Sequence, residues 1–222
     1  MNYAVIIGDI IESRQATDRA RLQQSLIEVL EQIDQRFAAD IAVPFQITLG
    51  DEFQGMLSGP EPSPALISTL REMLYPTEVR MSIGIGDVST EINPVITQID
   101  GPAFHFARRG IKALSSQKRT VTAYITSDEH ANQLLQALTL FSDMLLLDRT
   151  EKQWEAFRLY RLEKNLKKVA AQLNVKFQSI HKRLRAAHWD ELEEADKLLA
   201  GYLRMTTFTD NRVNKQNSPK KG

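Results

Sequence analysis

Cysteine is absent from the 222 residues of this sequence, which excludes disulfide bonds and thiolate metal sites. No apolar run approaches the roughly 18 residues that a membrane-spanning helix requires. The N-terminus lacks a basic segment followed by a cleavage site, so the pattern predicts no signal peptide. The 28 basic and 28 acidic residues cancel, and the net charge therefore demands no polyanionic partner. These absences predict a cytoplasmic protein without a membrane partner.

Hydrophobic residues make up 42% of the chain, enough for one good core and a small second module. The apolar patterns predict the order β-α-β-β-α-β-α-β followed by helices, which indicates an α/β fold, an α+β sandwich with a mixed sheet. The expected strands are 3–10, 45–49, 52–57, 79–86 and 121–126. The predicted division is an α/β domain over 1–150, an all-α module over 151–205 and a disordered polar tail over 206–222.

Two aspartates each follow a glycine at the end of a predicted strand. Asp9 ends the first strand and Asp51 lies in the turn of the hairpin. If the hairpin pairs beside the first strand, both carboxylates reach one edge of the sheet. Two oxygen ligands there suit Mg²⁺ or Mn²⁺, and Gly8 and Gly50 would let a ligand approach closely. The alternative is that Asp9 caps a loop and Asp51 is an ordinary turn residue.

Three arginines near this edge are candidates for phosphate contacts. Arg14 follows the first strand in a loop over the predicted site, and Arg80 and Arg108 have similar status. For each of them a solvated surface charge is the alternative interpretation.

Four blocks of the sequence together resemble the SatD family of bacterial proteins. They are residues 8–10 (Gly-Asp-Ile), 49–53 (Leu-Gly-Asp-Glu-Phe), 80–86 and 100–109, in matching order over roughly the first 125 residues. The same blocks are similar to the catalytic domain of class III nucleotidyl cyclases. That resemblance implies a ferredoxin-like, nucleotidyl-cyclase-like mixed sheet, with metal aspartates at the positions of Asp9 and Asp51. Residues 50–53 also occur in diguanylate cyclases, which we interpret as shared geometry only.

The resemblance to cyclases is incomplete at the residues that would perform the reaction. It implies a phosphate-stabilising role for Arg109, which is retained. His105 stands where cyclases have the transition-state asparagine, and Ile47 stands where they have a purine-reading lysine. His105 is therefore a candidate hydrogen-bond donor or simply a histidine on a helix face. Metal and triphosphate binding would survive these changes more readily than turnover.

The C-terminal part resembles the helix-turn-helix of bacterial regulators over about twenty residues. Ala170 is the small residue that the helix crossing needs, and Asn174 is tolerant of a left-handed turn. Apolar anchors stand at 169, 173, 175, 180 and 184. Residues 158–185 hold nine Lys or Arg against one acid, Glu163. The second helix would present to DNA the residues Gln178, Ser179, Lys182, Arg183 and Arg185.

A plain helical hairpin with a solvated basic face is the alternative interpretation of this segment. The amphipathic helix after it, from Trp189 to Leu203, would support the motif, form a dimer seam or pack on the core. Trp154, Phe157 and Tyr160 are expected to pack the junction between the two parts.

Three functions are compatible with these features. The first is a DNA-binding regulator, expected to be a homodimer, whose cyclase-like domain binds metal and nucleotide or serves for dimerisation. The second is an active metal-dependent nucleotidyl-transfer enzyme. The third is a non-catalytic scaffold. The basic C-terminal segment favours the first, and the changes at Ile47 and His105 count against the second.

Overall fold

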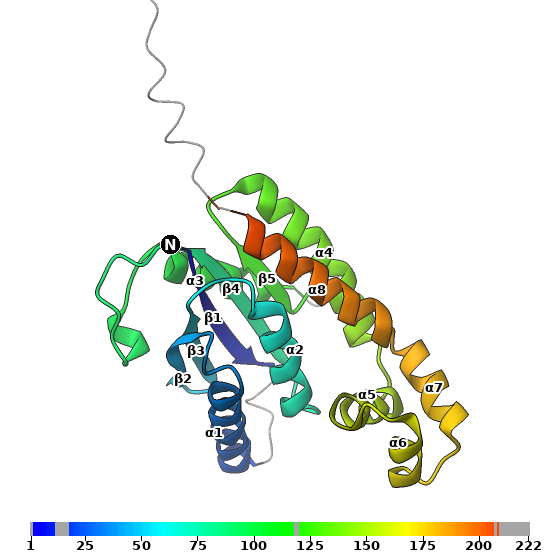
Figure 1. The fold of residues 1–222 in the computed structure, drawn as a ribbon. Helices are drawn as coiled ribbons and strands as arrows, with labels where there is room; N and C mark the ends of the chain where they lie inside the picture. Colours follow the sequence, from blue (N-terminus) through cyan, green and yellow to red (C-terminus); the bar gives the residue numbers. More distant parts are fainter. Residues whose placement is uncertain (1, 12–17, 118–119, 207, 209–222) are drawn as a thin grey trace, which may run out of the picture.

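The computed structural model describes residues 2–11, 18–117, 120–206 and 208 of the chain. A five-stranded sheet lies at its centre, in the order β2-β3-β1-β4-β5 (Figure 1). The strands are β1 (Tyr3–Ile10), β2 (Ile41–Leu49), β3 (Glu52–Leu57), β4 (Val79–Gly86) and β5 (Thr122–Ile125). Neighbouring strands are antiparallel except for β4 and β5, which are parallel. The first four strands thus form a ferredoxin-like core, and the predicted mixed sheet is confirmed.

Helices cover both faces of the sheet. The helices α1 (Arg19–Arg36) and α2 (Ser63–Leu74) lie on one face, and α3 (Pro102–Leu114) lies on the other, preceded by the short 3₁₀ helix η2 (Ile96–Gln98). Alternate residues of β1 divide between two cores because strand side chains point to opposite faces. Ala4 and Ile6 pack with α1 and α2, whereas Val5 and Ile7 pack with α3.

Local sequence signals explain where the first elements begin and turn. The side chain of Asp18 accepts a hydrogen bond from the backbone N–H of Arg21 and so caps α1. Gly50 has a φ of +65°, the left-handed conformation that the tight turn between β2 and β3 requires. At Gly84 an added Cβ would overlap the backbone of Ala103 and Ala107, so this glycine allows α3 to lie directly on β4.

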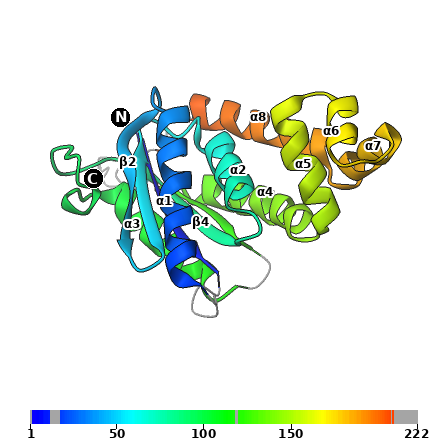
Figure 2. The ribbon, with the colours of Figure 1, turned by 90° about the horizontal axis from the view of Figure 1, so that it is seen from below.

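The remaining helices are α4 (Glu129–Leu147), α5 (Glu151–Glu163), α6 (Leu166–Gln172), α7 (Phe177–Ala186) and α8 (Trp189–Met205). Figure 2 shows α5, α6 and α7 gathered at one end of the molecule, with α4 and α8 extending towards them from the sheet. These three helices and the start of α8 enclose a core of their own, which includes Phe157, Ile180 and Trp189.

The last helix belongs to both parts of the molecule. Trp189 at its start packs in the core of the helical end, whereas Leu203 near its end packs in the core under α1 and α2. The module predicted for 151–205 therefore shares its last helix with the α/β part. Phe208 is 5% exposed and packs against Tyr202. The tail predicted for 206–222 thus includes one buried aromatic ring, and most of that tail lies outside the described residues.

Aromatic stacking joins the helical end to the α/β part at Trp154, as the sequence predicts for this residue: its ring stacks on that of Tyr75 with 5.0 Å between centroids. Phe157 and Tyr160 instead meet the Trp189 ring edge to face within the core of the helical end. Within the described residues, no helix has the length and apolar character needed to cross a lipid bilayer.

Candidate functional sites

The first candidate site lies where β1, β3 and β4 run side by side. Asp9 is opposite Glu52 on one neighbouring strand and Arg80 on the other, which brings the hairpin beside the first strand as predicted. The side chains of these three residues point to the α3 face of the sheet, because cross-strand partners share a face. Asp51 precedes Glu52 at the hairpin turn and is half-buried. We call Asp9, Asp51, Glu52, Arg80 and Arg108 the carboxylate cluster.

Asp9 and Glu52 are half-buried, and each has an arginine beside it. Arg80 Nη2 lies 3.5 Å from Asp9 Oδ2. Arg108, on α3, pairs with Glu52 through both of its terminal nitrogens, and its Nη2 donates to Oε1 at 3.0 Å. Gln54 and Thr48 also donate to Glu52. The cluster is therefore a network of paired charges at the edge of the α3 layer.

The electrostatics of Asp9 and Glu52 differ. Burial first, and then the negative charge of Asp51, raise the pKa of Asp9, although Arg80 opposes them. Burial also acts to raise the pKa of Glu52, but hydrogen bonds from Arg108, Gln54 and Thr48 outweigh it and hold this pKa below its ordinary value. Asp9 and Asp51 are thus close enough to repel each other, and a bound cation would relieve that repulsion.

The fit of this cluster to a divalent cation is partial. Asp9 and Asp51 supply the two carboxylates that the sequence predicts as ligands, but Arg80 already neutralises part of that charge. No group of three or more His, Asp or Glu side chains in the described part of the chain is arranged to hold a metal ion. A cation here would take its remaining ligands from water and phosphate, as Mg²⁺ commonly does.

The predicted phosphate-handling residues of α3 contact groups outside the carboxylate cluster. His105 Nε2 is 3.4 Å from Asp100 Oδ1, and both side chains are largely exposed. The Arg109 guanidinium stacks 5.3 Å from the centroid of the Phe106 ring. One position earlier on the helix, Arg108 faces the cluster instead. Arg14 lies outside the described residues, and the catalytic roles of His105 and Arg109 stay predictions.

The two glycines of the predicted site serve the fold. Gly8 is opposite Phe53, and a Cβ at position 8 would overlap the Phe53 ring, on the sheet face opposite to Asp9. Gly50 forms the hairpin turn described above. Their proposed part in binding a ligand stays a prediction.

The second candidate site is the hairpin of α6 and α7. Asn174 has a φ of +50°, the left-handed turn that the sequence predicts between the two helices. Val169, Ala170, Ile180 and Leu184 are buried, and Leu173 and Val175 pack against them. The two helices therefore have the sequence spacing, the turn and the buried anchors of a helix-turn-helix.

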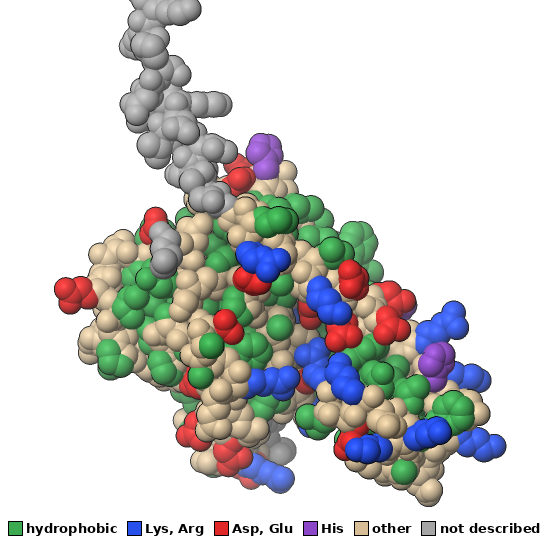
Figure 3. Space-filling view, in the orientation of Figure 1, with side chains coloured by type: hydrophobic (Ala, Val, Ile, Leu, Met, Phe, Trp, Pro, Cys, Tyr) green, Lys and Arg blue, Asp and Glu red, His purple; other side chains and the backbone are tan. Residues whose placement is uncertain are grey.

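One face of α7 points to solvent. Gln178, His181, Lys182 and Arg185 are exposed and stand at i, i+3, i+4 and i+7, so they share a face opposite Ile180 and Leu184. We call these four residues the α7 face. Sequence reasoning missed His181, which the i+3 spacing from Gln178 would have found. Figure 3 shows Lys and Arg side chains gathered at this end of the molecule.

Two residues predicted to contact DNA are turned away from that face. Ser179 is partly buried, and Arg183 Nη1 lies 3.4 Å from Glu155 Oε2 of α5 with its side chain 20% exposed. The pair of Arg183 and Glu155 thus joins α7 to α5. Arg183 follows Ser179 by one helical turn, so both residues lie on the inner side of α7.

Taken together, these features define a protein with an α+β sheet domain carrying a cluster of carboxylates and arginines, joined to a C-terminal helical module. The chain belongs to the SatD family, whose family model matches residues 3–190. No curated protein sequence matches this chain.

Solved structures of limited similarity include nucleotidyl cyclase domains. A dimeric guanylyl cyclase domain of the RhoGC fusion protein from the fungus Blastocladiella emersonii has 19% identity and a TM-score of 0.38, over 53% of this chain and 74% of that one. The adenylyl cyclase CyaB from P. aeruginosa has 17% identity and a TM-score of 0.37, over 50% and 71%.

A third solved structure is similar over a longer stretch of the chain. A regulator of polyketide synthase expression from Bifidobacterium adolescentis covers 92% of this chain and 82% of its own, with 14% identity and a TM-score of 0.27.

Proposed function

We propose that this protein is a DNA-binding regulator in which the α7 face contacts DNA. The observation that carries the proposal is the unpaired positive charge on the α7 face. Residues 164–187 contain seven Lys or Arg and no Asp or Glu, and three of the seven pair with acids outside this range, namely Lys164, Lys168 and Arg183. Among the described residues, neither Lys182 nor Arg185 forms an ion pair within the protein. Amide and cationic side chains on one helix face are suited to base edges and phosphates in a major groove.

The test measures affinity for double-stranded DNA against salt concentration. Replacing both Lys182 and Arg185 by alanine should weaken binding about tenfold or more, because two phosphate or base contacts are lost. Arg183→Ala is the matched control, since this arginine lies on the inner side of the same helix. Unchanged binding in the double variant, with the fold intact by circular dichroism, would exclude the α7 face as the DNA-contacting surface.

In the same proposal, the α/β domain binds a divalent cation with a nucleotide, or holds two copies of the chain together. The mutual repulsion of Asp9 and Asp51 supports a cation, Mg²⁺ or Mn²⁺, at these carboxylates. A thermal-shift panel with ATP, GTP and cyclic dinucleotides, with and without Mn²⁺, tests it. Stabilisation should require Mn²⁺ and disappear in Asp9→Ala. Light scattering tests the homodimer, which a helix-turn-helix protein needs to bind two half-sites.

A second candidate function is metal-dependent nucleotidyl transfer, which the approach of Asp9 to Asp51 also supports. A cation there would neutralise triphosphate charge and activate a hydroxyl group. The expected result is turnover of ATP or GTP that requires Mg²⁺ or Mn²⁺ and is abolished by Asp51→Asn. Binding without turnover would leave the regulatory role of this domain in place and exclude the enzyme.

A further inference from the structure

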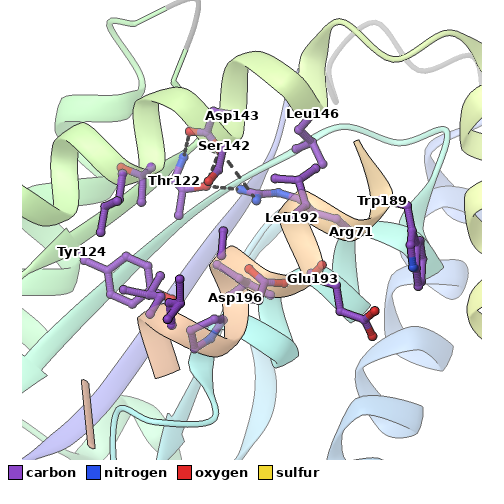
Figure 4. A pocket seen from close by; sticks show the side chains of 18 of the residues that line it. Arg71, Thr122, Tyr124, Ser142, Asp143, Leu146, Trp189, Leu192, Glu193 and Asp196 are labelled. Carbon is purple, nitrogen blue, oxygen red and sulfur yellow. Dashed lines mark hydrogen bonds and ion pairs between the residues drawn. The ribbon is translucent and has the colours of Figure 1, made fainter. Parts of the chain in front are cut away.

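A pocket of about 270 Å³ lies at the junction between the α/β part and the C-terminal helices. Its walls come from α2, β5, α4, α5 and α8. The pocket therefore depends on the packing of α8 against the sheet domain. Figure 4 shows Tyr124, Asp143, Leu146, Trp189, Leu192 and Asp196 around it. None of these residues belongs to the carboxylate cluster or to the α7 face.

The walls and mouth of this junction pocket are apolar. Ile67, Leu146, Leu192 and Leu199 contribute to the lining. Three further leucines of the lining are largely exposed, namely Leu134 (47%), Leu138 (43%) and Leu198 (66%). Exposed leucines gathered at the opening of a pocket are typical of a site that takes an apolar group.

One end of the pocket is polar and rich in arginine. Arg71, Arg149 and Arg161 line it and come from three different segments of the chain. Arg71 donates to Val121 O and Thr122 Oγ1 and lies 3.9 Å from Asp143, as Figure 4 shows for Thr122 and Asp143. Arg161 Nε is 3.0 Å from Glu72 Oε1.

Arg149 differs from the other two arginines. It is 8% exposed, and in the described part of the chain it forms no ion pair with a carboxylate. Its Nε and Nη2 instead donate to the carbonyl oxygen of Ala187. Its guanidinium also lies over the Phe157 ring, 3.8 Å from the centroid. A buried guanidinium satisfied only by neutral groups is a favourable place for an anion.

The carboxyl groups near these arginines lose their protons at a higher pH than usual. Burial is the main cause that raises the pKa of Glu72 to about 7 and that of Asp196 to about 6. Burial lowers the pKa of Arg149 to about 10, which leaves it charged. Glu72 is therefore about half protonated at neutral pH, which reduces the negative charge beside Arg149 and Arg161.

We propose that the junction pocket binds a monocarboxylate with an apolar body, such as a medium-chain fatty acid. The carboxylate lies at the end formed by Arg149 and Arg161, and the hydrocarbon chain runs between the leucines of α4 and α8 towards the mouth. A divalent cation does not fit, because Arg71 and Arg161 already pair with Asp143 and Glu72, and no three acidic or histidine side chains of the described residues are arranged to hold a metal ion. A nucleotide does not fit either, because its polar sugar and phosphates would lie against leucine walls.

Isothermal titration calorimetry with decanoate tests this site on the full chain. We expect saturable single-site binding to the wild type. Decanol, which has the same chain and no charge, should bind about tenfold or more weakly, since it loses charge-assisted hydrogen bonds. Acetate, which has the head group alone, should not bind. Absence of decanoate binding, or equal binding of decanol, would overturn the proposal.

Two variants that fill the pocket locate the site. Ala195→Phe projects a ring from α8 into the space, and Ser142→Phe does so from the α4 side, so that one serves if the other fails to fold. Both should weaken decanoate binding about tenfold or more. Ala137→Phe is the matched control, because Ala137 is exposed on α4 and outside the lining. Unchanged binding in a folded filling variant would place decanoate elsewhere and overturn the assignment.

Discussion

The charges of the α/β part and those of the α6–α7 hairpin differ in how they are compensated. Arg80 and Arg108 in the carboxylate cluster each face an acidic side chain, and Arg161 at the junction faces Glu72. On the α7 face, Lys182 and Arg185 point to solvent without an acidic partner among the described residues. Paired charges hold elements together, whereas unpaired exposed cations remain available to an external anion. Four predictions test this distinction.

The largest effect is expected where a buried pair is broken. Arg161→Ala should lower the free energy of unfolding by about 3–5 kcal/mol, because it leaves Glu72 buried without its partner. Chemical denaturation at neutral pH measures it. Arg158→Ala on the same helix is the control, since Arg158 is exposed and should change stability by about 0.5 kcal/mol or less. Equal losses in the two variants would contradict a structural role for the Arg161–Glu72 pair.

A somewhat smaller effect concerns pH. The pKa of Glu72 is raised from 4.5 to about 7 in the folded state, so its contribution to stability is complete below 4.5 and is lost as the pH rises through about 7. Glu72→Gln removes this titration. The variant should therefore gain stability relative to the wild type across that range, by on the order of 3 kcal/mol. Denaturation curves at several pH values check it, and a gain by the wild type instead would contradict the prediction.

A third test separates the two arginines of α7. Arg185→Ala should reduce the slope of log affinity for DNA against log salt by about 1, because one phosphate contact is lost. Arg183→Ala should leave that slope unchanged, since its guanidinium is held by Glu155. Fluorescence anisotropy at graded salt concentrations measures both. The reverse result would show that the inner side of α7 meets the DNA.

The smallest effect is a change in one pKa. Asp51→Asn should lower the pKa of Asp9, because the neighbouring negative charge is removed, while burial still keeps this pKa above 3.8. Carboxyl chemical shifts followed by NMR report it. An unchanged pKa would mean that the two carboxylates are too far apart to share a cation.

Periodicity and turn residues predicted most of the fold. The strands, the cap at Asp18 and the left-handed Asn174 were predictable, because each depends on a few neighbouring residues. The sequence did not predict which arginine of α3 faces Glu52. Side chains at neighbouring positions of a helix point about 100° apart around its axis, so Arg108 and Arg109 face different surroundings. The pairing of Arg183 with Glu155 depends on how α5 meets α7, a long-range contact that single-sequence patterns do not contain. The junction pocket escaped prediction for the same reason, because five segments build it.

The path of α8 has a consequence for dissecting the molecule. This helix begins against the helical hairpin and ends with Leu203 in the core of the sheet domain. Stopping the chain at residue 150 would therefore remove part of the sheet domain's own interior and expose apolar surface. Excising α5 to α7 and bridging α4 to α8 would spare it. The DNA-binding hairpin we propose is thus connected to the sheet domain on both sides, through α5 and through α8. A displacement of α8 at the junction would therefore change the orientation of the hairpin relative to the sheet.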